Sequence, residues 1–276
     1  MRTRDTMRLW RDNSLPDGLE LLRASCFDHR YPAHFHEEFV IATFTRGAER
    51  YRVSAREGVA NAGTLMIIPP GEVHSAEAVE RDRGWDYCAF YPSQAFLERI
   101  ADGVLGGQGA LDFGSEVVRH DPVVTRNLLR AHAVVSGSQD AIEKQCAVYE
   151  AFGAVIGHYG KRGRRRSRPP TLDVNIRDAV AFLQEHYDRP VTVREVASVV
   201  GLSEYHFMRA FRAKSGLSVH SYLTQIRLHR AKALLARGVA AVETALAVGF
   251  FDQSHLTNQF RKYFGVTPGA FVAASR

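Results

Sequence analysis

The chain has 276 residues, of which 45% are hydrophobic and 24% are charged. This composition is sufficient for one large core or two ordinary ones, and it excludes a fibrous or disordered chain. The first residues carry charges of both signs, and no apolar run is long enough to span a bilayer, so we expect a cytoplasmic protein with no secretory signal and no membrane partner. The three cysteines are far apart and form no CxxC pair, which argues against a disulfide framework or a cysteine zinc site.

The net charge of +6 is distributed unevenly along the chain. Residues 1–160 carry 17 Lys and Arg against 22 Asp and Glu, residues 161–170 carry 6 against none, and residues 171–276 carry 13 against 8. The basic segment, KRGRRRSRPP, has too much like charge to build a core, so we expect an extended linker at 161–171. The charge pattern therefore predicts a first domain at 1–160 and a second at 172–276, of which only the second seeks a polyanion.

Between residues 31 and 92 the sequence alternates short apolar runs with Gly, Pro and charged turns, which is typical of antiparallel strands in a sandwich or barrel. HFHEEF places His34, His36 and Glu38 two residues apart, so that on a strand all three point to one face. His74 follows in GTLMIIPPGEVH. Trp85, Tyr87 and Tyr91 share a strand face and either line the same cavity or belong to plain core.

Three chemistries are open to the histidines. They and the carboxylate suit Fe, Mn or Zn, with His34, His36 and His74 as the ligands. They equally suit a small polar effector without metal, or they are hydrogen-bonded barrel residues. We favour the effector, because buried imidazoles and a carboxylate need polar partners.

Two helices are predicted next, at 121–135 and 141–159. The first begins with an Asp cap and a Pro, and the second follows the break Ser-Gly-Ser. Each has an apolar stripe that needs a partner surface, either in its own domain or in a second copy of the chain.

The last part of the chain contains an internal repeat. VREVASVVGLSEYHFMRAFRAKSG can be laid on AVETALAVGFFDQSHLTNQFRKYFG with one insertion just after a shared glycine. Each unit reads as helix, glycine-containing turn and second helix, and a helix at 219–237 joins the two. This is the helix-turn-helix plan, in which the second helix enters the major groove of DNA.

The outward faces of the two second helices carry hydroxyls, amides and Arg, which match the donors and acceptors of base edges and phosphates. The predicted DNA-contacting residues are Ser203, Tyr205, His206, Met208, Arg209 and Arg212 in the first unit, and Gln253, Ser254, Thr257, Asn258 and Arg261 in the second. Thr192 and Glu195 form a capping box before the first unit, whereas Ala240 leaves the second unit without a cap.

The last hundred or so positions resemble the DNA-binding domain of the AraC/XylS family of bacterial transcription regulators, and GFFDQSHLTNQFRKYFGVTPGAF resembles the C-terminal signature of that family. The histidine segment and the G-x5-P-x-G-x2-H pattern resemble a cupin barrel, the sensory half of the same family. The resemblance implies a small effector bound without metal or cofactor, double-stranded promoter DNA and RNA polymerase as partners, and a homodimer.

We therefore predict an α+β multidomain chain, with an N-terminal cupin-like β-barrel and helical extension followed by an all-α double helix-turn-helix domain. The expected function is effector-controlled transcription regulation, with activation favoured over repression, and no enzymatic activity. One rival is a metal-dependent cupin enzyme with a basic helical appendage. A second is a helical protein-interaction module, which needs more repeats than the two found here.

Overall fold

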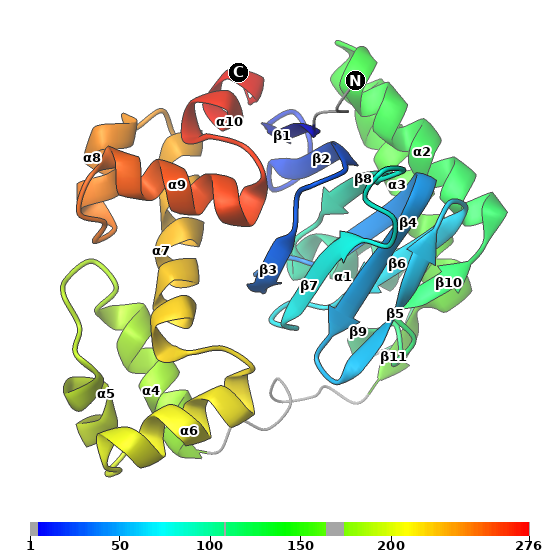
Figure 1. The fold of residues 1–276 in the computed structure, drawn as a ribbon. Helices are drawn as coiled ribbons and strands as arrows, with labels where there is room; N and C mark the ends of the chain where they lie inside the picture. Colours follow the sequence, from blue (N-terminus) through cyan, green and yellow to red (C-terminus); the bar gives the residue numbers. More distant parts are fainter. Residues whose placement is uncertain (1–4, 108, 164–173, 276) are drawn as a thin grey trace. The chain divides into compact units, whose positions relative to one another are not determined.

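The computed structural model describes residues 5–107, 109–163 and 174–275 (Figure 1). The chain forms two compact units. The first comprises the described residues within 1–30, 36–72 and 76–167, and the second those within 31–35, 73–75 and 168–276. No helix in the described part of the chain is both long and apolar enough to cross a membrane.

Strands dominate the first part of the chain, as predicted for residues 31–92. They are β1 (Thr6–Asp12), β2 (Leu19–Cys26), β3 (Tyr31–His34), β4 (Val40–Val53), β5 (Arg56–Asn61), β6 (Thr64–Ile68), β7 (His74–Ala78), β8 (Trp85–Tyr91) and β10 (Val118–His120). The main path of hydrogen-bonded neighbours runs β1-β2-β8-β4-β6-β10, while β5 and β7 pair with β4, and β3 pairs with β7. The pairs for which a register is defined are antiparallel. β1, β2 and β10 lie outside the predicted strand region.

The two faces of the sheet bury different kinds of side chain. Trp10, Leu21 and Phe90 stand opposite one another on β1, β2 and β8. Trp10 and Phe90 both make edge contacts with His132, at ring distances of 5.3 Å. Since successive residues of a strand alternate between faces, Tyr91 belongs to the other side of β8. One face therefore packs on helices, and the other is free to enclose polar groups.

Three helices complete the first unit: α1 (Gln94–Val104), α2 (Pro122–Gly137) and α3 (Ala141–Tyr159). The Asp121 carboxylate accepts from the amides of Val123 and Val124 at 3.0 Å, and that of Asp140 accepts from Ile142 at 2.8 Å. These caps confirm the two predicted helices. Both apolar stripes are buried within the unit, so they need no second copy of the chain to cover them; the buried members include Val124, Leu128, Val148, Phe152 and Val155.

The expected linker begins later than predicted. Lys161–Gly163 forms a short strand, β11, which pairs with β9 (Ala110–Asp112). The Arg162 guanidinium is largely buried, donates to Glu98 at 2.7 Å, and also pairs with Asp102. A cation surrounded by carboxylates is held in the unit rather than left in a solvated tether. Residues 164–171 lie outside the described part.

Apart from residues 31–35 and 73–75, the second unit is helical in its described part. Its helices are α4 (Val174–Glu185), α5 (Val193–Val199), α6 (Glu204–Ser215), α7 (Val219–Ala236), α8 (Ala241–Ala247), α9 (Gln253–Phe264) and α10 (Pro268–Ala274). α5 and α6 form the first helix-turn-helix, and α8 and α9 form the second, as the repeat predicted. α7 runs between them and packs against both (Figure 1). At 1.5 Å per residue, its 18 residues span about 27 Å.

Candidate nucleic-acid interface and ligand site

α6 has one buried and one exposed face. Phe207 and Phe211 are fully buried in a core that α4, α5 and α7 share. The hydroxyl of Ser203 caps the helix at the amide of His206, and Gly216 ends it with a φ of 76°. Side chains on the other face are exposed: Ser203, His206, Met208, Arg209 and Arg212. Tyr205 lies in the same helix, but its side chain is outside the described part.

α9 repeats this arrangement with different chemistry. Asp252 caps it by accepting from the amide of His255 at 2.7 Å, and Gly265 ends it with a φ of 74°. Leu256, Phe260 and Phe264 are buried, as the spacing predicted. On the other face Gln253, Ser254, Asn258 and Arg261 are exposed, whereas Thr257 is half-buried.

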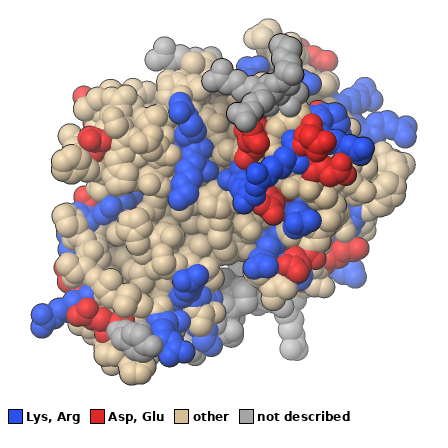
Figure 2. Space-filling view, in the orientation of Figure 1, with Lys and Arg blue, Asp and Glu red and all other residues tan. Residues whose placement is uncertain are grey.

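The two exposed faces differ in charge. α6 and the adjoining α5 present exposed cations, namely Arg194, Arg209, Arg212 and Lys214. Figure 2 shows Lys and Arg side chains at the lower left, where Figure 1 shows these two helices. α9 presents mainly amides and hydroxyls. The sequence reasoning missed Phe251, which stands before the cap of α9 and is 86% exposed. The sequence around Phe251 does not indicate that its ring is exposed, because a pattern of residues does not distinguish an exposed aromatic side chain from a buried one.

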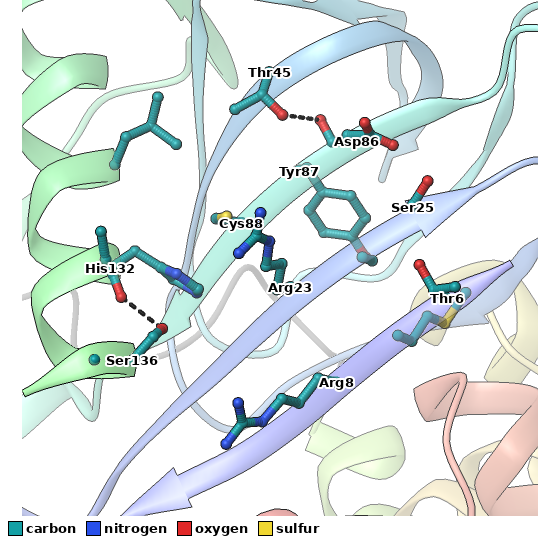
Figure 3. A pocket seen from close by; sticks show the side chains of 15 residues that line it. Thr6, Arg8, Arg23, Ser25, Thr45, Asp86, Tyr87, Cys88, His132 and Ser136 are labelled. Carbon is teal, nitrogen blue, oxygen red and sulfur yellow. Dashed lines mark hydrogen bonds between the residues drawn. The ribbon is translucent and has the colours of Figure 1, made fainter.

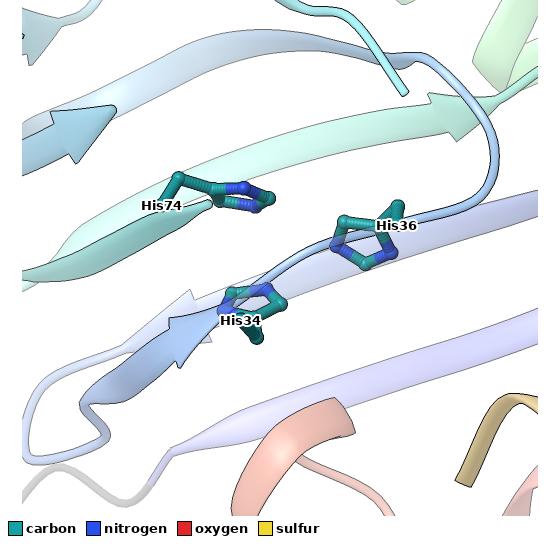
Figure 4. Close-up of side chains that lie close together, drawn as sticks. All are labelled: His34, His36 and His74. Atoms are coloured by element: carbon teal, nitrogen blue, oxygen red, sulfur yellow. The ribbon is translucent and has the colours of Figure 1, made fainter. Parts of the chain in front are cut away.

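The three predicted histidines come together in the structure (Figure 4). One ring nitrogen from each of His34, His36 and His74 lies within 4.8 Å of the others, and all three residues are buried. The ring centroids of His34 and His74 are 4.2 Å apart. Burial holds the pKa of His34 well below its usual value, and neighbouring His74 lowers it further. His34 is therefore neutral at physiological pH, and its Nδ1, 2.7 Å from the Pro32 carbonyl, donates to that oxygen.

This donor set fits a metal ion in type, although the predicted fourth ligand does not belong to it. Imidazoles suit Zn or Fe as ligands. Glu38, however, is not a member of the group that the described residues form. The expectation that one strand carries His34, His36 and Glu38 is wrong, because β3 ends at His34. The His36 carbonyl accepts from the Gly71 amide instead, and the chain bends at Glu37 and Glu38 before β4 begins.

A buried acid adds to the polar character of this region. Glu49 on β4 is 5% exposed, and burial raises its pKa to about 8, so the carboxyl keeps its proton at neutral pH. The Trp85 indole lies near enough to lower this pKa in part, although its N–H makes no hydrogen bond of ordinary length and angle. The sequence analysis missed Glu49, since GAERYRV resembles an exposed strand.

The predicted aromatic residues are buried around the same acid. Trp85 stacks on Tyr87 at 6.4 Å, and Tyr91 lies 4.9 Å from the His36 ring. Burial raises the pKa of Tyr91 above its usual range, and nearby carboxyls raise it further, namely Glu20, Glu38 and Glu49. Histidines, aromatics and acids thus form one polar cluster beside the sheet.

Comparisons with known proteins agree with this arrangement. Residues 18–152 match the AraC-like ligand binding domain, and residues 196–274 match a helix-turn-helix domain. An uncharacterised HTH-type transcriptional regulator of Bacillus subtilis, YbfI, is 29% identical over 238 residues, 86% of each chain. The arabinose operon regulatory protein of Escherichia coli is 25% identical over 261 residues, 85% of this chain and 80% of its own.

Solved structures show the same fold at low identity. ToxT of Vibrio cholerae, in an apo K231A form, aligns with a TM-score of 0.57 at 12% identity over 99% of this chain and 98% of its own. ToxT with a bound unsaturated fatty acid aligns at 0.55 and 12% identity, over 100% and 98%. A ligand-binding domain followed by a double helix-turn-helix domain, with relatives that share both, defines the chain as a member of the AraC/XylS family of DNA-binding transcription regulators.

Proposed function

We propose that a small polar effector binds beside His34, His36 and His74 and changes how α6 and α9 meet promoter DNA. The observation that carries this proposal is the pair of capped helices, each with a buried apolar face and an exposed hydrogen-bonding face, at the two ends of α7. An effector shifts DNA binding only by its differential affinity for the two arrangements of the protein.

On each exposed face, some residues are placed to contact bases and others to contact phosphates. Arg209 and Asn258 occupy matching positions in the middle of α6 and α9, where a side chain reaches a base edge. Arg212 and Arg261 lie in the last turns and suit phosphate. The proposed contacts are Ser203, Tyr205, His206, Met208, Arg209 and Arg212, with Gln253, Ser254, Thr257, Asn258 and Arg261.

The polar cluster supports an effector with hydrogen-bonding groups of its own. The proposed lining comprises His34, His36, Glu38, His74, Trp85, Tyr87 and Tyr91, to which the structure adds Glu49. A hydrocarbon chain such as the fatty acid held by ToxT offers no hydrogen bonds to these polar side chains. A hydroxylated or amine-bearing metabolite satisfies them.

The test combines thermal unfolding and DNA binding of the full chain. Polar metabolites are screened for a rise in Tm, and a metabolite that binds should also shift the affinity for operator DNA. His36→Ala should abolish both responses and leave basal DNA binding intact. His120→Ala, at an exposed histidine of the same unit, is the matched control. If His36→Ala responds like the control, the effector lies elsewhere.

The family resemblance extends the proposal to assembly and output. We propose a homodimer that contacts RNA polymerase and activates transcription in the cytoplasm, where the chromosome lies. We also propose domain boundaries at 1–160 and 172–276, the linker beginning after β11. Light scattering checks the dimer, and transcription in vitro with purified polymerase checks activation.

The histidine group keeps a metal as the second candidate. His34, His36 and His74 would hold it, and an ion there would supply a Lewis acid beside the effector. We propose that the protein is not an enzyme. Near-stoichiometric Zn, Fe or Mn in the purified protein, lost in His36→Ala, would reverse the order of the two candidates.

A further inference from the structure

A cavity of about 630 Å³ lies in the first unit between strands β1, β2 and β8 and helix α2 (Figure 3). Arg8, Arg23 and Cys88 line it from the strands, and His132 and Ser136 line it from the helix. Small-molecule sites in proteins are typically about 300–1,000 Å³. The space is therefore large enough for a metabolite.

Two arginines stand side by side in its wall. Arg8 and Arg23 are directly opposite each other in the antiparallel register of β1 and β2. Side chains at such positions lie on the same face, with Cβ atoms about 5 Å apart, and like charges there oppose folding. Both arginines are exposed, and none of the described carboxylates lies within 4 Å of either. Arg8 lies 4.9 Å over the ring of Trp10, a contact that leaves its N–H groups available.

The acid that borders the cavity is bound mainly by an arginine outside the pair, although Arg23 and Ser25 also interact with it. Asp86 is the one carboxylate among the residues that the structure assigns to this wall. Arg46 binds it through two hydrogen bonds of 2.7 Å, from Nε and Nη2. Burial opposes ionisation, but these hydrogen bonds help to hold the pKa of Asp86 below its usual value. Since Arg46 balances the charge of Asp86, the wall keeps a net positive charge from Arg8 and Arg23.

Neighbouring groups add hydrogen-bond donors and exclude a cation. The hydroxyl of Thr6 lines the same wall, one row of residues away from the arginines, beside Ser25, whose hydroxyl hydrogen-bonds to Asp86. Burial lowers the pKa of His132 to about 4, so its ring is neutral, and its Nε2 donates to the Leu22 carbonyl at 3.2 Å. Among the residues that line this wall, Asp86 is the one carboxylate that interacts with a guanidinium of the pair, that of Arg23.

We propose that this cavity binds a small dicarboxylate, with one carboxylate on Arg8 and the other on Arg23. Guanidinium groups match carboxylates in a planar, two-bond geometry, and two of them on adjacent strands match a ligand with two acids a few bonds apart. A dianion also removes the repulsion between the arginines, so binding stabilises the β1–β2 pair.

This site differs from the proposed effector site, although Tyr87 borders both. Arg23 and Cys88 face the helices, whereas Glu20 and Tyr91, three residues away on the same two strands, lie on the opposite face of the sheet. The two faces also differ in composition, since the polar cluster holds imidazoles and a protonated Glu49, and this wall holds two arginines. One ligand cannot satisfy both.

The experiment uses the full chain, with calorimetry at constant ionic strength. Succinate should bind, and its neutral analogue succinamide should not. Arg8→Gln and Arg23→Gln should each weaken the Kd for succinate by about tenfold or more, because each removes a charged hydrogen-bonding partner. The control is Arg52→Gln combined with Arg126→Gln, at exposed positions of the same unit outside the cavity, and it should bind as the wild type does.

Two further readouts distinguish folding defects and the other site. Without ligand, Arg23→Gln should raise the Tm of the first unit, because it ends the repulsion; the variant thus remains informative even where it binds nothing. His36→Ala should still bind succinate, whatever it does to the effector response. Failure of succinate to bind the wild type overturns the proposal. So does equal binding by the glutamine variants, or a preference for inorganic phosphate over succinate.

Discussion

The two helix-turn-helix units have the same plan but are held together at different points. At the start of the first unit, Thr192 accepts from the amide of Glu195 at 3.2 Å, and the Glu195 carboxylate accepts from the amide of Thr192 at 2.7 Å. At the start of the second unit, Ala240 adopts the same extended conformation with no side-chain cap. The first unit therefore has a local stabiliser that the second lacks.

In the turns between the two helices, the second unit is the more closely packed one. Gly201 has a φ of 66°, and a methyl group added there would meet open space. Gly249 has a φ of 82°, and a methyl group there would lie 2.7 Å from the Tyr187 carbonyl and 3.0 Å from the Arg227 guanidinium. Arg227 itself donates to that carbonyl at 2.7 Å. The first helix-turn-helix is thus stabilised by its capping box. The second is stabilised by close packing of its turn at Gly249 against Tyr187 and Arg227.

The largest expected loss of stability comes from truncating a buried Phe in the core of either helix-turn-helix. Phe211 and Phe260 occupy matching positions and are both fully buried, Phe260 against Phe264 at 4.7 Å. Each substitution to Ala should cost about 3–5 kcal/mol of folding free energy. Hydrogen exchange should show Phe211→Ala opening α5 and α6, and Phe260→Ala opening α8 to α10. Phe251→Ala, at an exposed position, is the control. If either core variant opens both ends equally, the helical unit is one cooperative structure and the comparison fails.

The turn glycines should differ by their surroundings. Gly201→Ala should cost about 1–2 kcal/mol, the strain of a left-handed conformation alone. Gly249→Ala adds a clash with backbone that cannot move freely, for a total of about 2–4 kcal/mol. Denaturant unfolding of the full chain measures both. Equal losses would show that the Tyr187 loop yields easily, and the close packing of the second turn would then contribute little.

Substitutions at Arg209 on α6 and Asn258 on α9 compare the contributions of the two helices to DNA recognition. Arg209→Ala should weaken specific DNA binding by about 1–3 kcal/mol and relax preference at one or two base pairs. Asn258→Ala should do the same at a different part of the operator, one groove away. Binding to randomised operators measures both. A loss that is uniform across sequences would identify Arg209 as a phosphate contact and contradict its assignment to a base.

The helical unit could be anticipated in detail because its signals are local. Capping residues, apolar spacing and turn glycines act within a few positions, and Thr192, Ser203 and Asp252 cap helices as predicted. The histidines also came together as predicted, although the strand that was expected to carry them ends at His34.

What could not be anticipated depends on distant parts of the chain. Arg162 falls in the predicted linker, and its burial depends on an ion pair with Glu98 on α1. Glu49 is buried only because the sheet folds over it. The opposition of Arg8 and Arg23 follows from the register of β1, whose sequence shows mixed charge and no strand signal. Ion pairs, burial and register are tertiary properties, and local pattern does not contain them.

The smallest expected effect comes from exchanging the caps. Ala240→Ser places a hydroxyl where the backbone is already extended, three residues before Glu243, and so should create a capping box in the second unit. We expect a gain of about 1 kcal/mol, and a similar loss from Thr192→Ala in the first unit. Denaturation midpoints of the two variants and of their combination measure this, and the combination should come close to the wild type.

The pH dependence of the caps sharpens the same test. Hydrogen bonds from the Thr192 amide and hydroxyl, with Arg189, lower the pKa of Glu195 to about 2. A lowered carboxyl pKa stabilises the fold above the unfolded-state value and loses that effect as pH falls through the folded-state value. Between about pH 4 and pH 2, Thr192→Ala should therefore flatten the decline in stability, whereas Ala240→Ser should steepen it through Glu243. If Ala240→Ser changes neither the midpoint nor the slope, the second unit is limited by its packing at Gly249, and its missing cap is not a weakness.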